Sequence, residues 1–359
     1  MFTSIDIPFK RVINLQQKTA GVFMRLRDFR GEVWTNIHPD ILKAMITVND
    51  EIVDGNNGKD SHSKNADRLM QSFFSDTIYT TYTINGTAAN VIALKAMCDR
   101  WSTIICAEQT HINTYECGAT EYMLGNKILS IPSADGKLSV ELIEKLLNGQ
   151  KKYKYLPKVI VLTQPTEFGT VYTNRQIKEI CNFAHSRNMY VYIDGARIAN
   201  AIVELNTTLT EMIENTGVDA FSFGGTKAGA LFGEMVVFRH REFAMALEYS
   251  QKQSLQHLDK SKFLGVQIEY LLQSGLWLEN ARISNRMAKI LEQKLLEKGV
   301  KTFYPVQTNM VFAILTKEEL DKINAVFDLH YWNETDKSVR IATTYLTTEQ
   351  KIDELVSLI

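Results

Sequence analysis

The chain has 359 residues, a mass of 40.9 kDa and 45% hydrophobic residues, which is enough for two domains or for one large α/β domain with an appendage. Its 40 Lys and Arg against 41 Asp and Glu give a net charge of −1, so no nucleic-acid or anionic-membrane partner is expected. No apolar run approaches the roughly 20 residues of a membrane span, and the N-terminus lacks a secretory signal, so a cytoplasmic location is predicted. The four cysteines show no CxxC spacing, which argues against a zinc site and a disulfide framework.

Residues 1–30 are rich in Lys and Arg and carry a partial helical stripe of apolar residues. They indicate either an added arm that packs on a neighbouring subunit or a surface helix with a solvated basic face. The next segment, residues 31–45, places Pro39 at the first turn of a predicted helix. The regular part of the chain therefore begins at about residue 31.

A strand rich in Thr and Tyr is predicted over residues 76–84, and a helix over residues 88–97. Between them stands the sequence Asn85-Gly86-Thr87. A tight turn from a strand into a helix forms an anion site, because free backbone N–H groups and the helix dipole both point at the incoming charge. Thr87 can also be interpreted as a simple N-cap, and the two interpretations are compatible.

The next predicted strands end in polar residues. Residues 103–106 lead to His111 and Glu116, and residues 159–163 lead to Glu167. A lone histidine after a strand is more often structural than catalytic, and a glutamate there can be a loop cap. On spacing alone, these residues are candidates for a site and for structural roles alike.

Two further strands deliver a carboxylate and an amine to one edge of a sheet. Residues 190–193 form an apolar run that stops at Asp194, and residues 219–223 are followed by a glycine turn and Lys227. In open α/β sheets, ligands bind at the carboxyl ends of the strands. A lysine amine can form a Schiff base with a carbonyl, and a carboxylate can hold a pyridine nitrogen protonated, which are the two demands of pyridoxal phosphate. An ordinary ion pair between Asp194 and Lys227 is the alternative.

Beyond residue 239 the composition shifts to a long amphipathic helical region over residues 264–296. Strands near 310–315 and 338–342, with helices over 317–326 and 348–358, predict a small α/β C-terminal domain. The alternation of strands and helices before it predicts an α/β fold with a doubly wound, mostly parallel sheet. The predicted domains are 1–30, an N-terminal extension; 31–250, a large pyridoxal-phosphate-binding domain; and 251–359, a helical connection and a small C-terminal domain.

Two blocks of sequence carry a resemblance to a known family. DGARIANA around Asp194 and SFGGTKAGALFGE around Lys227 are similar to signature blocks of the low-specificity threonine aldolases, in the β-eliminating lyase branch of the fold-type I pyridoxal-phosphate enzymes. The likeness runs from about Gly31 to the C-terminus and includes the segments around His111 and Arg340. The resemblance implies these site residues: Lys227, His111 and Asp194 for catalysis; Gly86, Thr87, Ala88, His111, Asp194, Arg197 and Lys227 for the cofactor; Arg197 and Arg340 for the substrate; and no metal ligand.

Several positions depart from the family pattern. The family has a polar sequence similar to SDN where this chain has Gly31, Glu32 and Val33. It also has a tyrosine on the substrate side where this chain has Asn57. Gln253 stands where the family carries an arginine that reaches a neighbouring subunit's phosphate. The resemblance therefore defines the cofactor better than it defines the substrate.

The activity implied by the resemblance is that of a pyridoxal-phosphate-dependent carbon–carbon lyase. It would cleave a β-hydroxy-α-amino acid such as threonine or allo-threonine to glycine and an aldehyde, as a homodimer or homotetramer with an active site shared between chains. One alternative is an enzyme of the same fold that performs β-elimination, racemisation or transamination, which the changes at residues 31–33 and 57 motivate. The other is a catalytically silent relative kept for assembly or binding.

Overall fold

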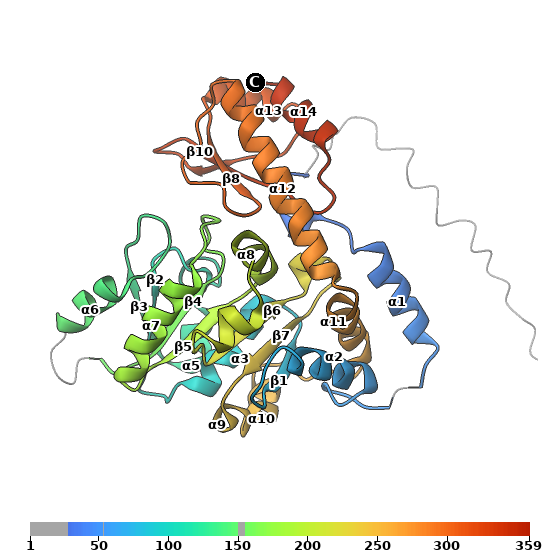
Figure 1. Ribbon diagram of the computed structural model, residues 1–359, viewed down its shortest axis with the longest axis vertical. Coiled ribbons are helices and arrows are strands. Elements are labelled where there is room, and N and C mark those ends of the chain that lie inside the picture. Colours follow the sequence, from blue (N-terminus) through green and yellow to red (C-terminus); the bar gives the residue numbers. More distant parts are fainter. Residues whose placement is uncertain (1–27, 53, 150–154) are drawn as a thin grey trace, which may run out of the picture.

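The computed structural model describes residues 28–52, 54–149 and 155–359, so most of the predicted extension over residues 1–30 lies outside the described part (Figure 1). Its centre is a seven-stranded sheet in the order β1-β7-β6-β5-β4-β2-β3. The strands are β1 (Tyr79–Thr83), β2 (Thr103–Ala107), β3 (Lys127–Ile131), β4 (Pro157–Thr163), β5 (Tyr190–Asp194), β6 (Ala220–Gly224) and β7 (Glu234–Phe238). Strands β2 to β6 run parallel, and β7 is antiparallel to both β6 and β1. The predicted mostly parallel α/β sheet is therefore confirmed.

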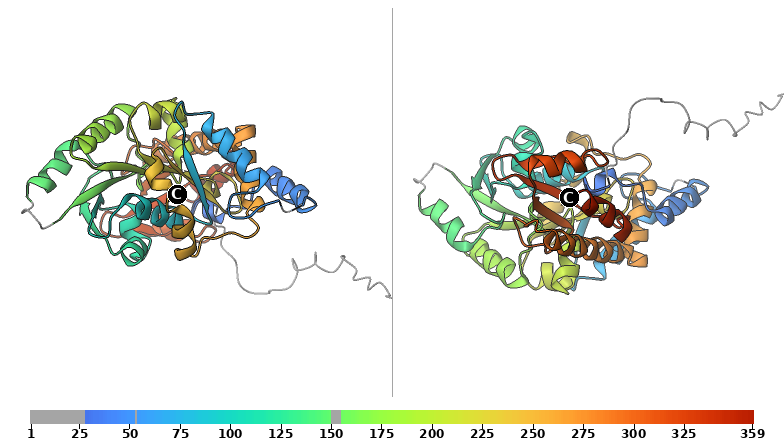
Figure 2. Two further views of the ribbon diagram at one scale, coloured as in Figure 1. Left: turned by 90° about the horizontal axis from the view of Figure 1, so that it is seen from below. Right: turned by 90° about the horizontal axis from the view of Figure 1, so that it is seen from above.

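Helices cover both faces of this sheet (Figures 1 and 2). Alternate strand residues enter different cores: Val191 and Ile193 belong to the core on one face of the sheet, whereas Tyr192 belongs to the core on the other. Because both faces of the sheet are buried, the sequences of its central strands are nearly continuous apolar runs. The helices of this part are α1 (Pro39–Asn49), α2 (Ser61–Gln71), α3 (Gly86–Met97), α4 (His111–Thr114), α5 (Ala119–Leu124), α6 (Val140–Asn148), α7 (Asn174–Ser186), α8 (Ile198–Leu205), α9 (Arg241–Ala244), α10 (Leu247–Gln253) and α11 (Lys262–Ser274), with the short turns η2 (Glu32–Trp34), η3 (Thr210–Glu214) and η4 (Thr226–Ala228).

A second unit is built on a three-stranded antiparallel sheet in the order β8-β10-β9, at the top of Figure 1. Its elements are β8 (Met310–Ile314), α13 (Lys317–Ile323), β9 (Tyr331–Asn333), β10 (Ser338–Ala342) and α14 (Glu349–Ser357). The described end of the predicted extension belongs here. The Ala342 N–H donates to the Phe29 carbonyl at 2.9 Å, and Phe29 is buried in the core of this unit. Residues 28–30 therefore pack with the C-terminal sheet.

The predicted helical region over residues 264–296 consists of two helices, α11 and α12 (Leu276–Glu297). Gly275 separates them with a φ of 72°, a left-handed conformation that ends α11 and that glycine adopts without a steric penalty. The first turns of α12 pack in the large core through Trp277, and its second half packs in the small core. This helix therefore connects the two units (Figure 1).

One edge of the large sheet gathers the strand ends that the sequence singles out. There β5 ends at Asp194, β6 ends at Gly224, and β1 leads into the turn before α3. Because β7 is antiparallel to its neighbours, it begins at this same edge, with Glu234. Glu234 pairs with Gly224 on one side and with Thr83 on the other. The edge therefore carries residues from the start of one strand and the ends of several others.

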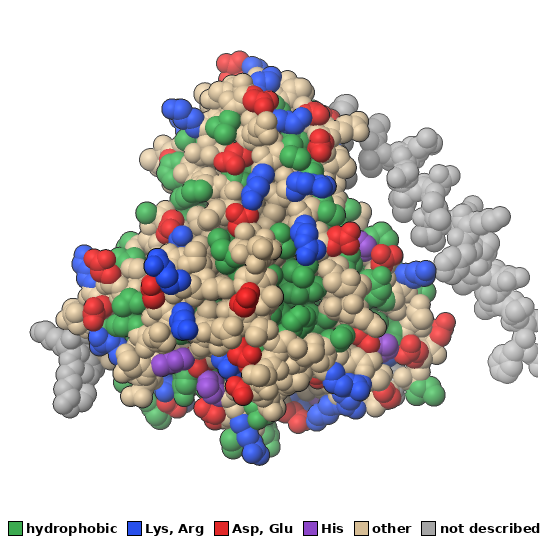
Figure 3. All heavy atoms as spheres, in the orientation of Figure 1, with side chains coloured by type: hydrophobic (Ala, Val, Ile, Leu, Met, Phe, Trp, Pro, Cys, Tyr) green, Lys and Arg blue, Asp and Glu red, His purple; other side chains and the backbone are tan. Residues whose placement is uncertain are grey.

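Charges of both signs are interspersed over the face shown in Figure 3, in keeping with the formal net charge of −1. The largest group of hydrophobic side chains on that face lies below the lower end of α12. This face therefore presents no single-sign field of the kind that attracts nucleic acid. Within the described part of the chain, no helix combines the length and apolar character that a membrane crossing requires.

Gly195, which follows β5, is expected to tolerate no side chain. A Cβ there would lie 2.1 Å from the carbonyl oxygen of Ser222 on β6 and 3.1 Å from Ile198. Gly195→Ala should therefore lower the free energy of unfolding by about 1–3 kcal/mol, as overpacking does, in urea denaturation. Gly86→Ala is the matched control: a Cβ there would meet nothing within 4 Å, so the change should stay below ~0.5 kcal/mol. Equal stability of the two variants would contradict the close contact of β5 and β6.

Candidate active site

A cavity of about 160 Å³ lies at this edge of the large sheet. It brings together six of the predicted site residues: Gly86, Thr87, His111, Asp194, Arg197 and Lys227. The other lining residues are Val33, Asn85, Asn90, Thr163, Pro165, Glu167, Ala196, Thr226 and Glu234. Ala88 and Arg340, which complete the predicted set, are not among the lining residues.

The start of α3 presents free backbone donors to the cavity. Its cap is Asn85, whose side chain accepts a hydrogen bond from the Ala88 N–H at 2.9 Å, so the alternative in which Thr87 caps the helix is wrong. The N–H groups of Gly86 and Thr87 make no hydrogen bond with a described residue. Free N–H groups at a helix start favour the binding of an anion.

Asp194 is held in place by a network of neutral groups. The carboxylate is 3% exposed, and its Oδ1 accepts from the Ala196 N–H at 3.1 Å. Asn90 Nδ2 donates to Asp194 Oδ2 at 3.0 Å and to Glu116 Oε1 at 2.7 Å. The Tyr192 hydroxyl in turn donates to Asn90 Oδ1 at 2.9 Å. A single amide therefore fixes the relative position of two buried acids.

His111 begins α4 and is held by Glu116, the second candidate of its segment. Its Nδ1 lies 2.8 Å from Glu116 Oε1, and no described residue hydrogen-bonds Nε2. Burial lowers the pKa of His111, but the hydrogen bond to Glu116 and the nearby carboxylates outweigh it, so the pKa is raised. Burial raises the pKa of Glu116, against the opposing hydrogen bond from His111. The pair therefore fixes the ring and leaves Nε2 free.

Lys227 lies in the turn η4, directly after β6. Burial, followed by the positive charge of Arg197, lowers the pKa of its amine. Its Nζ forms no hydrogen bond or ion pair with a described residue, so the alternative of an ion pair with Asp194 is wrong. A lowered pKa favours the neutral amine, which is the nucleophilic form.

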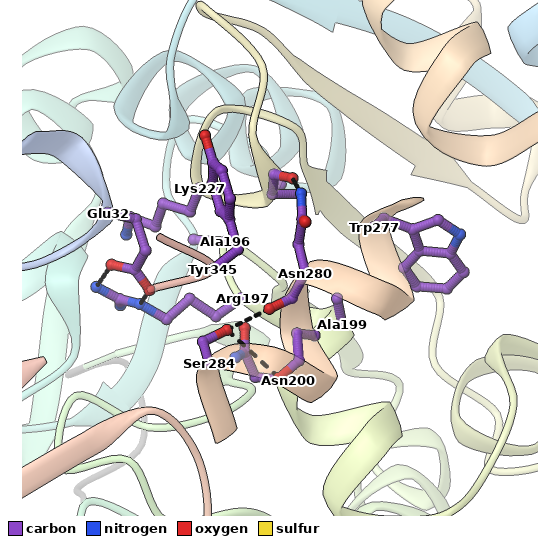
Figure 4. Close-up of a pocket in the computed structure, with 13 residues that line it drawn as sticks. Glu32, Ala196, Arg197, Ala199, Asn200, Lys227, Trp277, Asn280, Ser284 and Tyr345 are labelled. Carbon is purple, nitrogen blue, oxygen red and sulfur yellow. Dashed lines mark hydrogen bonds and ion pairs between the residues drawn. The ribbon is translucent and has the colours of Figure 1, made fainter. Parts of the chain in front are cut away.

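Arg197 is anchored by Glu32, one of the residues at which the chain departs from the family pattern (Figure 4). Its Nε and Nη2 donate to the two carboxylate oxygens of Glu32 at 2.7 and 3.0 Å. Asn309 Nδ2 donates to Glu32 Oε1 at 2.7 Å. Burial raises the pKa of Glu32, but the charge and hydrogen bonds of Arg197 outweigh it and lower the pKa to about 2. The pair uses Nε–H and one Nη2–H of Arg197, and it leaves both hydrogens of Nη1 and the second hydrogen of Nη2 for a ligand.

Arg340 comes from β10 of the small unit. Its guanidinium carbon lies 5.0 Å from the ring centre of Trp332, and Nη2 donates to the Arg30 carbonyl at 3.4 Å. The ring of Tyr115 lies between this group and the imidazole, with centroid distances of 5.8 Å to Trp332 and 5.5 Å to His111. A row of aromatic rings therefore connects the small unit to the edge of the cavity.

Two departures from the family pattern lie away from the cavity. Asn57 Nδ2 donates to Gln251 Oε1 at 3.0 Å, and Gln253 Oε1 accepts from Lys95 Nζ at 2.8 Å. Neither Asn57 nor Gln253 lines the cavity of this chain. The implied position of residue 57 on the substrate side is therefore not found within a single chain.

Sequence reasoning missed three residues that line or support the cavity. Asn90 interrupts the apolar run of α3, and Glu234 opens the apolar strand β7, so each carries a signal as an isolated polar residue. Asn309 carries no such signal, because its role depends on Glu32, 277 positions earlier in the chain. Glu167, a candidate from its strand end, lines the cavity and is 6% exposed.

The cavity fits the three polar groups of pyridoxal phosphate that a protein must bind: the ring nitrogen, the aldehyde and the phosphate. Asp194 offers a buried carboxylate for a pyridinium nitrogen, Lys227 an unbonded amine for an aldehyde, and the start of α3 free N–H groups for a phosphate. Among the described residues, no group of three His, Cys, Asp or Glu side chains is arranged to hold a metal ion. The sheet and this cavity define the class of the fold-type I pyridoxal-phosphate enzymes.

Comparison with known proteins identifies the branch of this class. The family model described as beta-eliminating lyase matches residues 28–318, and the chain belongs to that family. It is 32% identical over 302 residues to the low specificity L-threonine aldolase of Pseudomonas aeruginosa, across 83% of this chain and 87% of that enzyme. The enzyme of the same name from a Pseudomonas sp. is 30% identical across 92% of this chain and 96% of its own length. The solved structure of Leishmania major threonine aldolase matches with a TM-score of 0.86 and 29% identity, across 91% of this chain and 97% of that one.

Glu116→Gln should lower the pKa of His111, because a neutral amide removes both the charge and the charge-assisted hydrogen bond that raise it. The neutral fraction of His111 at a given pH should then increase. NMR titration of the histidine Cε1–H resonances measures the shift, and the His111→Gln variant assigns the resonance. An unchanged pKa would show that Glu116 does not control the protonation of His111.

Proposed function

We propose that the chain is a pyridoxal-phosphate-dependent aldolase that cleaves a β-hydroxy-α-amino acid, such as threonine or allo-threonine, to glycine and an aldehyde. The observation that carries this proposal is the meeting of Asp194 and Lys227 at one cavity, in a chain 30–32% identical to two threonine aldolases. The solved Leishmania major threonine aldolase, with the same fold over nearly its whole length, supports it further.

The cofactor supplies an electron sink for the charge left on the substrate when its Cα–Cβ bond breaks. Asp194 would keep the pyridine nitrogen protonated, and Asn90 orients the carboxylate through its 3.0 Å hydrogen bond. The N–H groups of Gly86 and Thr87 would bind the phosphate, while Ala88 shapes the turn through its bond to Asn85. Residues of β5 and α3 would thus hold the cofactor at its ring nitrogen and at its phosphate.

Lys227 and His111 have different roles in this proposal. The lowered pKa of Lys227 favours the neutral amine that anchors the cofactor when no substrate is present. His111 Nε2 accepts the β-hydroxyl proton, because Nδ1 is held by Glu116. A bound water or the phosphate is the alternative acceptor. His111 can act as this base only above its raised pKa, where the ring is neutral.

The substrate carboxylate is bound by guanidinium groups. Arg340 is the principal anchor, because a planar guanidinium can bind a carboxylate through two parallel hydrogen bonds. Arg197 contributes its outer N–H groups, since Glu32 accepts from Nε and from one hydrogen of Nη2. Arg197 lines the cavity, and Arg340 lies near enough for the charge of Arg197 to lower its pKa, so the two cations together support an α-amino acid as the substrate class.

Racemisation is a second candidate reaction. The alanine racemase TOXG of Cochliobolus carbonum is 25% identical to this chain over 247 residues, across 64% of this chain and 61% of that protein. An aldolase and a racemase need the same cofactor and differ in which bond to Cα breaks. β-Elimination, transamination and a catalytically silent protein are the remaining outcomes that product analysis separates.

The proposal extends to assembly, domains and location. A homodimer or homotetramer in the cytoplasm is proposed, with residues 31–250 as the cofactor-binding domain and 251–359 as the connection and small domain. Val33, which lines the cavity, is 63% exposed, and the adjacent Trp34 is 47% exposed. Exposed apolar side chains beside a binding cavity are typical of a surface that another subunit covers.

The holoenzyme should release acetaldehyde and glycine from threonine, measured by enzymatic reduction of the aldehyde and by amino-acid analysis. Protein reconstituted with pyridoxal phosphate should be yellow, and borohydride should fix the cofactor covalently to the peptide that contains Lys227. Conversion of L-alanine to D-alanine would identify a racemase, and a keto acid product a transaminase. A protein that stays colourless would contradict the assigned cofactor.

Arg340→Lys should lower kcat/KM for all amino-acid substrates by a similar factor and leave cofactor affinity unchanged. Lysine keeps the charge but loses the planar pair of donors, and one charge-assisted hydrogen bond is worth about 1.5–3 kcal/mol, or roughly 10- to 150-fold. Arg175→Lys is the matched control, since this guanidinium is 85% exposed on α7, and it should behave as the wild type. If both variants keep full activity, Arg340 does not bind the carboxylate.

A further inference from the structure

Glu234 is a buried acid in the cavity for which cleavage of the substrate provides no role. It lines the cavity, is 5% exposed and is the first residue of β7. In the sheet it pairs with Thr83, just before the turn that starts α3. On its other side it pairs with Gly224, just before the turn that carries Lys227. Glu234 therefore stands between the free N–H groups of α3 and the candidate catalytic lysine.

The carboxyl group of Glu234 has hydrogen-bond donors but no counter-ion. Its Oε2 accepts from the Gly225 N–H at 2.9 Å, and the Thr226 side chain also bonds to the carboxyl group. It forms no salt bridge with any Lys, Arg or His of the described ranges. A buried acid without a counter-ion favours the protonated form. Burial accordingly raises the pKa of Glu234 to about 7, although the Thr226 hydrogen bond and the charge of Lys227 act against it.

The ionisable groups that face Glu234 are Lys227 from η4, and Asp194 and Tyr192 from β5. The other elements around it present neutral residues: Thr83 from β1, Gly86 and Thr87 from the start of α3, and Leu264 and Ile268 from α11, which pack on the glycines beside it. Of these ionisable groups, only Lys227 can carry a positive charge, and its lowered pKa favours the neutral amine. The protonation of Glu234 therefore changes the net charge at this end of the cavity by one unit.

We propose that Glu234 stays protonated when the cofactor is bound, completes the phosphate-binding turn at the start of α3, and weakens cofactor retention when it ionises. The inference rests on the proposed function, because it takes the N–H groups of Gly86 and Thr87 as the phosphate site. A phosphate monoester carries about −1.5 to −2 charges at pH 7, so a carboxylate beside it is repulsive. A neutral carboxyl group adds a hydrogen-bond donor without that repulsion.

The test uses the apoenzyme and pyridoxine 5′-phosphate, which has the phosphate but no aldehyde and so cannot bond covalently to Lys227. Dissociation constants are measured by calorimetry between about pH 7.5 and 9, where the phosphate, with a second pKa of about 6, is almost fully ionised. For the wild type, the dissociation constant should rise toward tenfold per pH unit once Glu234 begins to ionise, as linkage to one proton requires. Glu234→Gln keeps the shape and the neutral charge, and its slope should be shallower than that of the wild type by the share that Glu234 contributes; Lys227 and the ring nitrogen of the ligand titrate in both proteins.

Proton uptake gives an independent measurement of the same linkage. Titrations at pH 8 in two buffers of different ionisation enthalpy should show that the wild type takes up close to one proton per ligand bound. Glu234→Gln should take up markedly fewer. Equal pH slopes in the two proteins, or no proton uptake by the wild type, would overturn the role of Glu234.

The same experiment separates this inference from the proposed function. Binding of pyridoxine 5′-phosphate without a difference between the two proteins removes Glu234 alone. Failure of the wild type to bind it, together with no colour after addition of pyridoxal phosphate, removes the proposed function as well.

Discussion

The buried ion pair between Glu32 and Arg197 is the interaction on which the geometry of the cavity depends. Glu32 comes from the turn before α1, Arg197 from the turn after β5, and Asn309, which donates to the same carboxylate, from the segment before β8. Asn309 also donates to the Thr343 carbonyl at 2.9 Å, so the small unit is tied to the large sheet at this point. Removing one partner of a buried pair leaves an uncompensated charge, at a cost of about 3–5 kcal/mol. The start of α8 and the small unit are therefore held in one arrangement.

The large sheet and the residues at its strand ends could be predicted from the sequence, because parallel strands bring their carboxyl ends to one edge. Asp194 and Lys227 needed only an apolar run that stops at a polar residue, and the anion turn at Gly86 needed only a strand, a glycine and a helix. The break between α11 and α12 was harder to predict. A single glycine such as Gly275 can either continue a helix or end it, and only packing on two cores decides between them.

Side-chain pairs between distant segments could not be predicted, because no local pattern specifies them. In the sequence, Glu32 is only one of three departures from the family pattern. In the structure its carboxylate forms an ion pair with Arg197. Asn90 lies within the helix predicted over residues 88–97, and the sequence does not show that its amide donates to both Glu116 and Asp194. Strand direction was equally hidden, since the run that begins at residue 234 looks the same in a parallel or an antiparallel strand. A polar residue at a strand start therefore escapes a search confined to strand ends.

The substrate side of the cavity is constrained by the backbone as well as by side chains. Gly31 has a φ of 126°, which glycine adopts readily and other residues do not, so the serine of the family pattern would be strained there. The turn that aims Glu32 at Arg197 thus removes a neutral donor for a carboxylate. Burial, and then the charge of Arg197, lower the pKa of Arg340. Two cations in a poorly solvated site are stabilised by a bound anion, and the carboxylate of the proposed amino-acid substrate would supply that charge.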